Sequence, residues 1–188
     1  SFFPPHHRAY VDLTGTYPTD VEKAKALLAE AGFSDGTSLS LRVPPFPYAT
    51  RSAEIIQAQF AKAGVDVSIE NVEWGFWLDE VYNKLNYDMT IVAHTAPNDL
   101  GNFANKATYF YGYENAGYQD LWDRIRTEAD PEARDELSRE AQRFLAREAV
   151  HGFLFQLPAL SIVRKELTGF RLSSPVQAQP LAPLRWQD

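Results

Sequence analysis

The spacing of apolar residues predicts alternating helices and strands in the first half of the chain. A helical stripe predicts a helix that begins at Thr19 and ends at Gly32. Glu22 stands three residues after Thr19, so these two side chains are expected to form a capping box. Strict alternation at residues 39–43 then predicts a half-buried strand, which the proline pair at 44–45 ends.

The same two periods continue as far as residue 93. A second helix is expected over 52–63, with a half-buried strand over 65–69. An aromatic-rich helix follows over 74–85. The nearly continuous apolar run at 89–93 is typical of a strand covered on both faces. This order of elements predicts the α/β class, with a mixed sheet flanked by helices.

The second half of the chain is less regular. Residues 94–118 are rich in Pro, Gly and Asn, with five aromatic residues between Phe103 and Tyr113. A loop of this length in a compact domain is usually functional. Helices are expected again over 119–129 and from Asp130, which can cap a helix with proline in its first position. Strands are predicted over 153–157 and 160–163.

These patterns divide the chain into three segments. Residues 1–18 are predicted to be a connecting segment and residues 19–172 an α/β ligand-binding lobe. Residues 173–188, with three prolines, are expected to form an irregular tail. The first residues have the composition of the middle of a chain, so we expect the sequence to be part of a longer protein.

Composition narrows the possible function. The net charge is −7 and the basic residues are scattered, which argues against a nucleic-acid partner. The absence of cysteine excludes a disulfide framework and thiolate metal sites. No cofactor or metal signature is found, and the adjacent pair His6–His7 lacks a third ligand at a suitable spacing.

Four strings, read in order, resemble one protein family. They are DVEKAKALLAEAGF with the following strand (20–41), IIQAQFAKAGVDVSIENVEW (55–74), YDMTIVAH (87–94), and the stretch from DPEARDELSREAQRFLAREAV to ELTGF (130–170). Together they resemble the C-terminal lobe of the family 5 solute-binding proteins, the peptide, nickel and oligosaccharide receptors of ABC importers. The resemblance covers nearly the whole chain.

The resemblance implies one lobe of a type II periplasmic-binding-protein-like fold, in a receptor that closes on its ligand like a hinged clamp. The implied partners are a small polar solute, the transmembrane subunits of an ABC permease and an N-terminal lobe. The implied location is periplasmic or otherwise extracytoplasmic. By the same analogy the tail would return toward the missing lobe, leaving apolar surface uncovered around Leu181, Leu184 and Trp186.

The loop after the strand at 89–93 is the first candidate ligand site, because ligands in open α/β sheets bind beyond the carboxyl ends of strands. Its candidates are His94, Thr95, Pro97, Asn98, Asp99, Asn102 and Phe103. In peptide-binding relatives this position resembles a Gly-Trp pair followed by an Asp that holds the peptide ammonium. Here His94 replaces the Trp, which favours a sugar-like solute slightly over a peptide. Alternatively, Asp99 and Asn102 only hold the loop.

Aromatic residues supply the other candidates. Trp74 is expected to stack on the ligand and Trp77 to pack in the core. The cluster at 109–113, which includes Tyr111, is expected to line the binding cleft in part and to cover the sheet in part. Capture of a peptide, oligosaccharide or metal chelate without chemistry is the main prediction. An enzyme with His94 and Asp99 as acid and base, and a signalling module, are the alternatives.

Overall fold

A computed structural model of the chain describes residues 1–33, 36–94, 99–158, 160–172 and 178–187. The chain divides into two compact units, residues 1–152 and 153–188. Each unit is described by itself. Within the described ranges, no helix combines the length and the apolar character needed to span a lipid bilayer.

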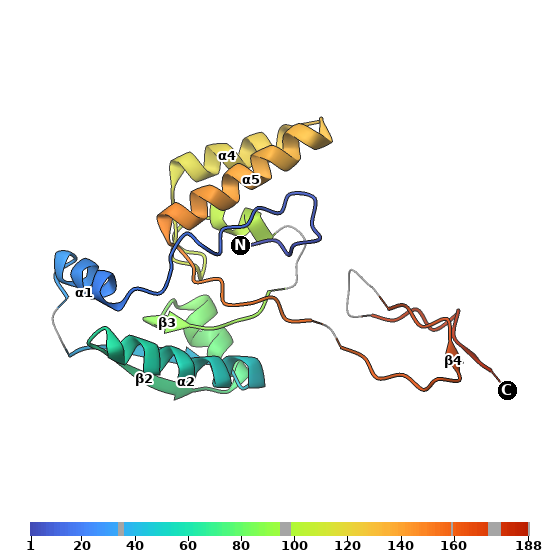
Figure 1. The fold of residues 1–188 in the computed structure, drawn as a ribbon, viewed down its shortest axis with the longest axis horizontal. Coiled ribbons are helices and arrows are strands. Elements are labelled where there is room, and N and C mark those ends of the chain that lie inside the picture. The colour runs from blue at the N-terminus through green and yellow to red at the C-terminus, as the bar shows by residue number, and fades with distance from the viewer. Residues whose placement is uncertain (34–35, 95–98, 159, 173–177, 188) are drawn as a thin grey trace. The chain divides into compact units, whose positions relative to one another are not determined.

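A parallel sheet organises the first unit (Figure 1). It consists of β1 (Thr37–Val43), β2 (Val65–Asn71) and β3 (Met89–Thr90), in the order β2-β1-β3. Helix α2 (Pro47–Lys62) connects β1 to β2, as a parallel pair requires. The expected α/β class is confirmed. Parallel and antiparallel pairing both occur, but in two separate sheets rather than in one mixed sheet.

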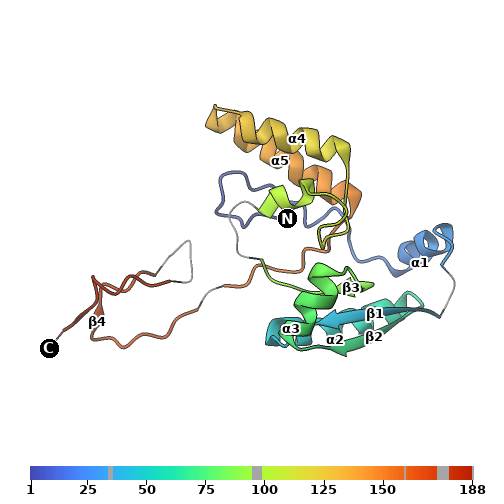
Figure 2. The same cartoon turned by 180° about the vertical axis from the view of Figure 1, so that it is seen from behind.

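Side-chain alternation gives the sheet two different faces. Leu41 and Val43 of β1 and Val67 of β2 are buried in one cluster with Ala49 and Ala53 of α2. Figure 2 shows the opposite side of the sheet, where α3 lies.

On that second face, Trp77 donates from Nε1 to Oγ1 of Thr90 at 2.9 Å. Thr90 in turn donates to the carbonyl of Arg42 at 2.7 Å. The alternation therefore fixes α2 on one face of the sheet and the indole of Trp77 on the other.

Helix α1 (Val21–Glu30) is capped one residue later than expected. Asp20 is its cap and accepts a hydrogen bond from the backbone of Lys23 at 2.9 Å, so the predicted capping box of Thr19 with Glu22 is wrong. The predicted end is correct, because Gly32 has a φ of +85° just past the helix.

The aromatic-rich helix has an unusual form. Helix α3 (Trp74–Phe76) is a single short turn that continues as the π-helix η1 (Trp77–Asn83). Two other predicted bounds need correction: α2 begins at Pro47 rather than near residue 52, and β3 covers only 89–90 of the expected 89–93. The shortening of β3 follows from its pairing, which joins it to β1 at two positions only.

A helical pair completes the first unit. The 3-10 helix η2 (Asp99–Ala104) leads through a loop to α4 (Ala116–Thr127), and α5 (Pro131–Glu148) lies beside α4 in both views (Figures 1 and 2). The predicted cap is confirmed, because Asp130 accepts from the backbone of Glu132 and Ala133 at 2.7 and 3.0 Å. The core between these helices contains Leu100, Phe103, Tyr118, Leu121, Ile125, Ala141 and Leu145.

The N-terminal segment packs against this helical pair. Gln142 of α5 is 1% exposed and donates to the carbonyl of Ala9 at 2.6 Å. The same side chain accepts from the backbone of Phe3 at 3.3 Å. His7 stacks on Phe3 with ring centroids 3.9 Å apart, and its Nδ1 accepts from the backbone of Ala9. His7 therefore serves the fold of this segment.

The second unit contains a short antiparallel ribbon of β4 (Leu167–Thr168) and β5 (Arg185–Trp186). The tail thus ends in a strand rather than being irregular throughout. The strands predicted over 153–157 and 160–163 are wrong, since the described residues there form neither helix nor strand. Their apolar side chains are exposed instead, Ile162 fully so. Leu181 and Trp186 are exposed as expected, at 74% and 66%, and Leu184 is half-buried.

Candidate functional site

The carboxyl ends of the three parallel strands meet at one edge of the sheet. The segment after β1 carries Phe46 and Tyr48, the segment after β2 carries Trp74, and the segment after β3 leads to His94. The hydroxyl of Tyr48 accepts a hydrogen bond from the backbone N–H of Ala93 at 3.0 Å. This bond ties the segment after β1 to the segment after β3, directly before His94.

Three aromatic side chains at this edge form what we call the aromatic platform: Phe46, Tyr48 and Trp74. Phe46 stacks on Tyr48 with centroids 5.8 Å apart and meets Trp74 edge to face at 5.4 Å. Phe46 and Trp74 remain 37% and 39% exposed. An exposed apolar surface of this kind can hold the apolar part of a ligand.

The buried side chain of Trp77 packs against the ring of Trp74 and thereby supports the platform. Its ring lies parallel to that of Trp74, with centroids 4.9 Å apart and planes 5° apart. It is 2% exposed, so the prediction that Trp77 packs in the core is confirmed. The stack fixes the orientation of the exposed Trp74 ring.

A polar group is linked to these rings through Phe110, whose ring contacts both Trp77 and His94. Nδ1 of His94 lies 3.3 Å from Oδ2 of Asp99. Asp99 is 5% exposed, and its other oxygen accepts from the side-chain amide of Asn102 at 3.0 Å. Because η2 begins at Asp99, one turn of helix brings Asp99 and Asn102 together. A buried carboxylate needs such partners, since desolvation otherwise disfavours its charge.

Aromatic side chains surround this polar group. His94 stacks on Phe110 with centroids 5.8 Å apart and meets Tyr111 at the same distance. Phe110 is buried, and its carbonyl accepts a hydrogen bond from the hydroxyl of Tyr87. Burial raises the pKa of Tyr109 to about 12 and raises the pKa of Tyr111 further. Both phenols are therefore neutral at physiological pH.

The structure adds His151 to the group. Its ring meets Tyr111 at 4.3 Å and Phe103 at 4.8 Å, edge to face in both cases. Burial, with a smaller contribution from the charge of His94, lowers the pKa of His151 to about 4. No local sequence pattern predicts this contact, because 57 positions separate His94 from His151.

Most of the predicted site residues come together. His94, Asp99, Asn102, Phe103 and Tyr111 form one connected group, and ring contacts through Trp77 and Phe110 link it to Trp74. Thr95, Pro97 and Asn98 lie outside the described residues. Phe46 and Tyr48 were missed, although their position just after a predicted strand was a usable signal.

Comparison with known proteins places the chain in a family. The model of the "bacterial extracellular solute-binding proteins, family 5 Middle" matches residues 1–118. The chain belongs to this family. It is 31% identical to the dipeptide-binding protein of Escherichia coli (strain K12) over 185 residues, which cover 90% of the chain and 34% of that protein. The chain thus spans about a third of the length of this relative.

Two solved family-like structures share the fold. A periplasmic binding protein from Helicobacter pylori, solved with the peptide STSA, has a TM-score of 0.64 at 26% identity, covering 79% of this chain and 31% of its own. A dipeptide-binding protein from Pseudoalteromonas sp. SM9913, solved with Met-Leu, has a TM-score of 0.73 at 23% identity, covering 98% and 39%. The type II periplasmic-binding-protein fold is thereby confirmed.

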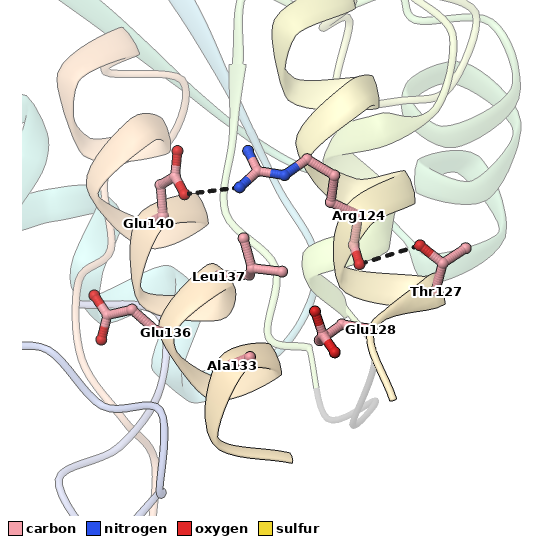
Figure 3. A pocket seen from close by; sticks show the side chains of 7 residues that line it. All are labelled: Arg124, Thr127, Glu128, Ala133, Glu136, Leu137 and Glu140. Atoms are coloured by element: carbon pink, nitrogen blue, oxygen red, sulfur yellow. Dashed lines mark hydrogen bonds and ion pairs between the residues drawn. The ribbon is translucent and has the colours of Figure 1, made fainter. Parts of the chain in front are cut away.

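The candidate site at the sheet edge is distinct from a pocket between α4 and α5 (Figure 3). This pocket has a volume of about 540 Å³ and is lined by Arg124, Thr127, Glu128, Ala133, Glu136, Leu137 and Glu140. Arg124 and Glu140 face each other at 3.8 Å, and both side chains are at least half exposed. The lining contains none of the residues at the sheet edge, so the pocket has no place in the site described above.

Chemistry on a bound molecule has little support at this site. Solute-binding proteins form the family, and the acid–base alternative rests on the single contact of His94 with Asp99. The described residues contain no group of three or more His, Asp or Glu side chains arranged to hold a metal ion. The arrangement can bind an apolar group beside a hydrogen-bonding polar one.

Proposed function

We propose that this chain is part of the binding protein of an ABC importer, which captures a short peptide outside the cytoplasmic membrane and delivers it to a membrane permease. Family membership supports the role in binding. The dipeptide-binding relative and the H. pylori protein solved with a peptide support the ligand class, which the sequence left open between peptide, oligosaccharide and metal chelate. The periplasm, or another extracytoplasmic space, is the corresponding location.

The geometry at the carboxyl edge of the sheet carries this proposal. The aromatic platform offers exposed ring faces to an apolar side chain of the ligand, and the group of His94, Asp99 and Asn102 offers polar contacts beside it. A peptide has both kinds of group within one short molecule. Thr95, Pro97 and Asn98, which lie between His94 and Asp99 in the sequence, belong to the same proposed site.

A second lobe completes the proposed receptor. The chain spans about a third of its dipeptide-binding relative, so the remaining part of such a receptor lies outside it. Burial between two lobes would give most of the affinity, because an open surface leaves much of a small ligand in water. We expect the complete protein to bind a dipeptide at least about a hundredfold more tightly than the 188-residue chain alone.

Replacing Trp74 tests the platform. We expect Trp74→Ala to weaken binding of an Ala-Phe dipeptide by the complete protein about tenfold, since one aromatic stack of about 1 kcal/mol and part of the buried area are lost. Isothermal titration calorimetry measures the affinity. Phe33→Ala removes a ring that is 46% exposed and has no part in the platform, and it should leave the affinity unchanged. Tight binding of an oligosaccharide with no binding of peptides would refute the proposed ligand class.

A further inference from the structure

The two partners of the His94–Asp99 contact differ in their access to solvent. The side chain of His94 is 31% exposed, and that of Asp99 is 6% exposed. Both carboxylate oxygens of Asp99 already face a partner, Oδ1 the amide of Asn102 and Oδ2 the ring of His94. A ligand that arrives at this site therefore meets the imidazole before it can reach the carboxylate.

The carboxylate decides which ring nitrogen carries the proton. An ionised carboxylate can only accept, so the proton of the neutral imidazole is favoured on Nδ1, which lies 3.3 Å from Oδ2. The other nitrogen, Nε2, then keeps a free lone pair and accepts hydrogen bonds. Protonation of the ring converts Nε2 into a donor and gives the ring a positive charge.

Neighbouring aromatic rings fix the position of the His94 imidazole, and these neighbours carry no charge at physiological pH. Phe110 stacks on it and Tyr111 contacts its edge. The raised pKa values of Tyr109 and Tyr111 keep both phenols neutral, and His151 is neutral above its pKa of about 4. An imidazole ordinarily gains or loses its proton between pH 5 and 8. The two phenols and His151 stay neutral over that range.

We infer that His94 is the residue that contacts the ligand and selects it by accepting a hydrogen bond at Nε2 from a ligand N–H, such as a peptide ammonium, and that Asp99 is a positioning residue that acts through His94. This inference rests on the proposed function, and it specifies the polar contact between the binding site and the peptide. It differs from direct binding of the ammonium by Asp99, because a contact through the imidazole is lost when the ring is protonated.

The protonation state of the free protein gives the first test. Long-range proton–nitrogen NMR of the complete protein, labelled at histidine, distinguishes the two neutral forms of each ring. We expect the His94 ring to carry its proton on Nδ1, with the signal assigned by its absence in His94→Gln. In Asp99→Asn an amide N–H can face Nδ1, so the proton should move to Nε2. A wild-type ring protonated on Nε2 would overturn the inference.

Ligand affinity against pH gives the second test. The probe is an Ala-Phe dipeptide, measured by calorimetry between pH 5 and 7, where its ammonium stays protonated. We expect wild-type affinity to fall about tenfold or more on acidification, because a protonated imidazole has no acceptor nitrogen and repels an ammonium. His94→Gln keeps an acceptor but does not titrate, so its profile should be flat. His6→Gln, at an exposed position, should behave like the wild type.

The outcomes separate the inference from the proposed function. A flat wild-type profile, or a His94→Gln profile as steep as that of the wild type, overturns the inference and leaves peptide capture intact. Absence of dipeptide binding at every pH overturns the proposed function and the inference with it. N-acetyl-Ala-Phe, which lacks the ammonium, should bind more weakly at pH 7 and change less with pH.

Discussion

At the scale of single residues, polar side chains within apolar surroundings determine much of the behaviour of this molecule. Asp99 is buried, and its two carboxylate oxygens face His94 and Asn102. His151 lies against aromatic rings and is held in the neutral form by burial.

His151 should make the protein less stable in mild acid. Its pKa of about 4 lies below the value near 6.5 of an unfolded chain, so between these values the unfolded state binds more protons. Stability therefore falls as the pH drops from 6.5 to 4, by up to roughly 3 kcal/mol from this residue. His151→Phe keeps a flat ring and should remove this part of the pH dependence, measured by urea unfolding at pH 7 and pH 4.5.

The exposed His6 provides the control for this measurement. His6→Gln, at an exposed position, should leave the pH dependence of unfolding as it is in the wild type. Equal acid sensitivity of the wild type and His151→Phe would show that burial does not hold His151 neutral.

Predictions for single residues succeeded where the contacts join residues that are close together in the sequence. Trp77 is buried as expected, and Trp74, three positions earlier on the same helical face, stacks on it. The grouping of His94 with Asp99 and Asn102 was also within reach, because all three lie within nine positions. The arrival of His151 depends on how α5 ends against the loop at 105–115, and no local pattern encodes that.

At the scale of elements, close packing of η2 on α4 fixes the position of Asp99, the first residue of η2. A Cβ atom on Gly101 would lie 2.5 Å from Cζ2 of Trp122, so the absence of a side chain lets the two elements approach. The hydroxyl of Tyr118 adds a buried hydrogen bond to the carbonyl of Leu100 at 3.0 Å. Asp99 and Asn102 flank this contact, which ties their positions to α4.

Gly101→Ala should destabilise the protein by about 1–3 kcal/mol, because the added methyl group forces the Trp122 ring or η2 to shift. Thermal unfolding measures the effect, and dipeptide affinity should fall in parallel. Gly75→Ala is the matched control in α3, where nothing lies within 4 Å of an added Cβ. It should be neutral or stabilise by about 0.5–1 kcal/mol. Equal effects of the two substitutions would refute the packing argument.

Some helix and strand boundaries could not be predicted from sequence patterns alone. Thr19 and Asp20 are both good caps, and the choice of Asp20 depends on the backbone at the entry to α1. The apolar alternation at 153–163 is genuine strand sequence, yet pairing needs a second strand, and the described residues of this chain supply none there. A sequence pattern indicates which secondary structure a segment favours, but it does not show whether a partner strand is present.

At the scale of the whole molecule, apolar surface is concentrated in the second unit. Leu160, Ile162 and Leu172 are each at least 88% exposed. Patches of this kind mark surfaces that meet another part of a protein. Because the chain spans about a third of its dipeptide-binding relative, we propose that the remaining part of the receptor covers residues 153–172.

Ile162→Ser should therefore act differently in two contexts. In the complete protein we expect a loss of about 1.5–3 kcal/mol of unfolding free energy, the value of one buried aliphatic side chain. In the 188-residue chain, where Ile162 is fully exposed, we expect no loss. Lys165→Ser, at an exposed polar position in the same segment, should be neutral in both. Equal effects of Ile162→Ser in the two contexts would contradict the proposed cover.

The parallel indole rings of Trp74 and Trp77 give the molecule a built-in optical signal. At a centroid separation of 4.9 Å, the electronic transitions of the two rings couple, so the pair acts as one chromophore with its own circular dichroism. One ring of this chromophore faces solvent and the other is locked to Thr90. A solute that settles on the outer ring alters the coupled spectrum directly, so occupancy can be followed in the near ultraviolet without any added label.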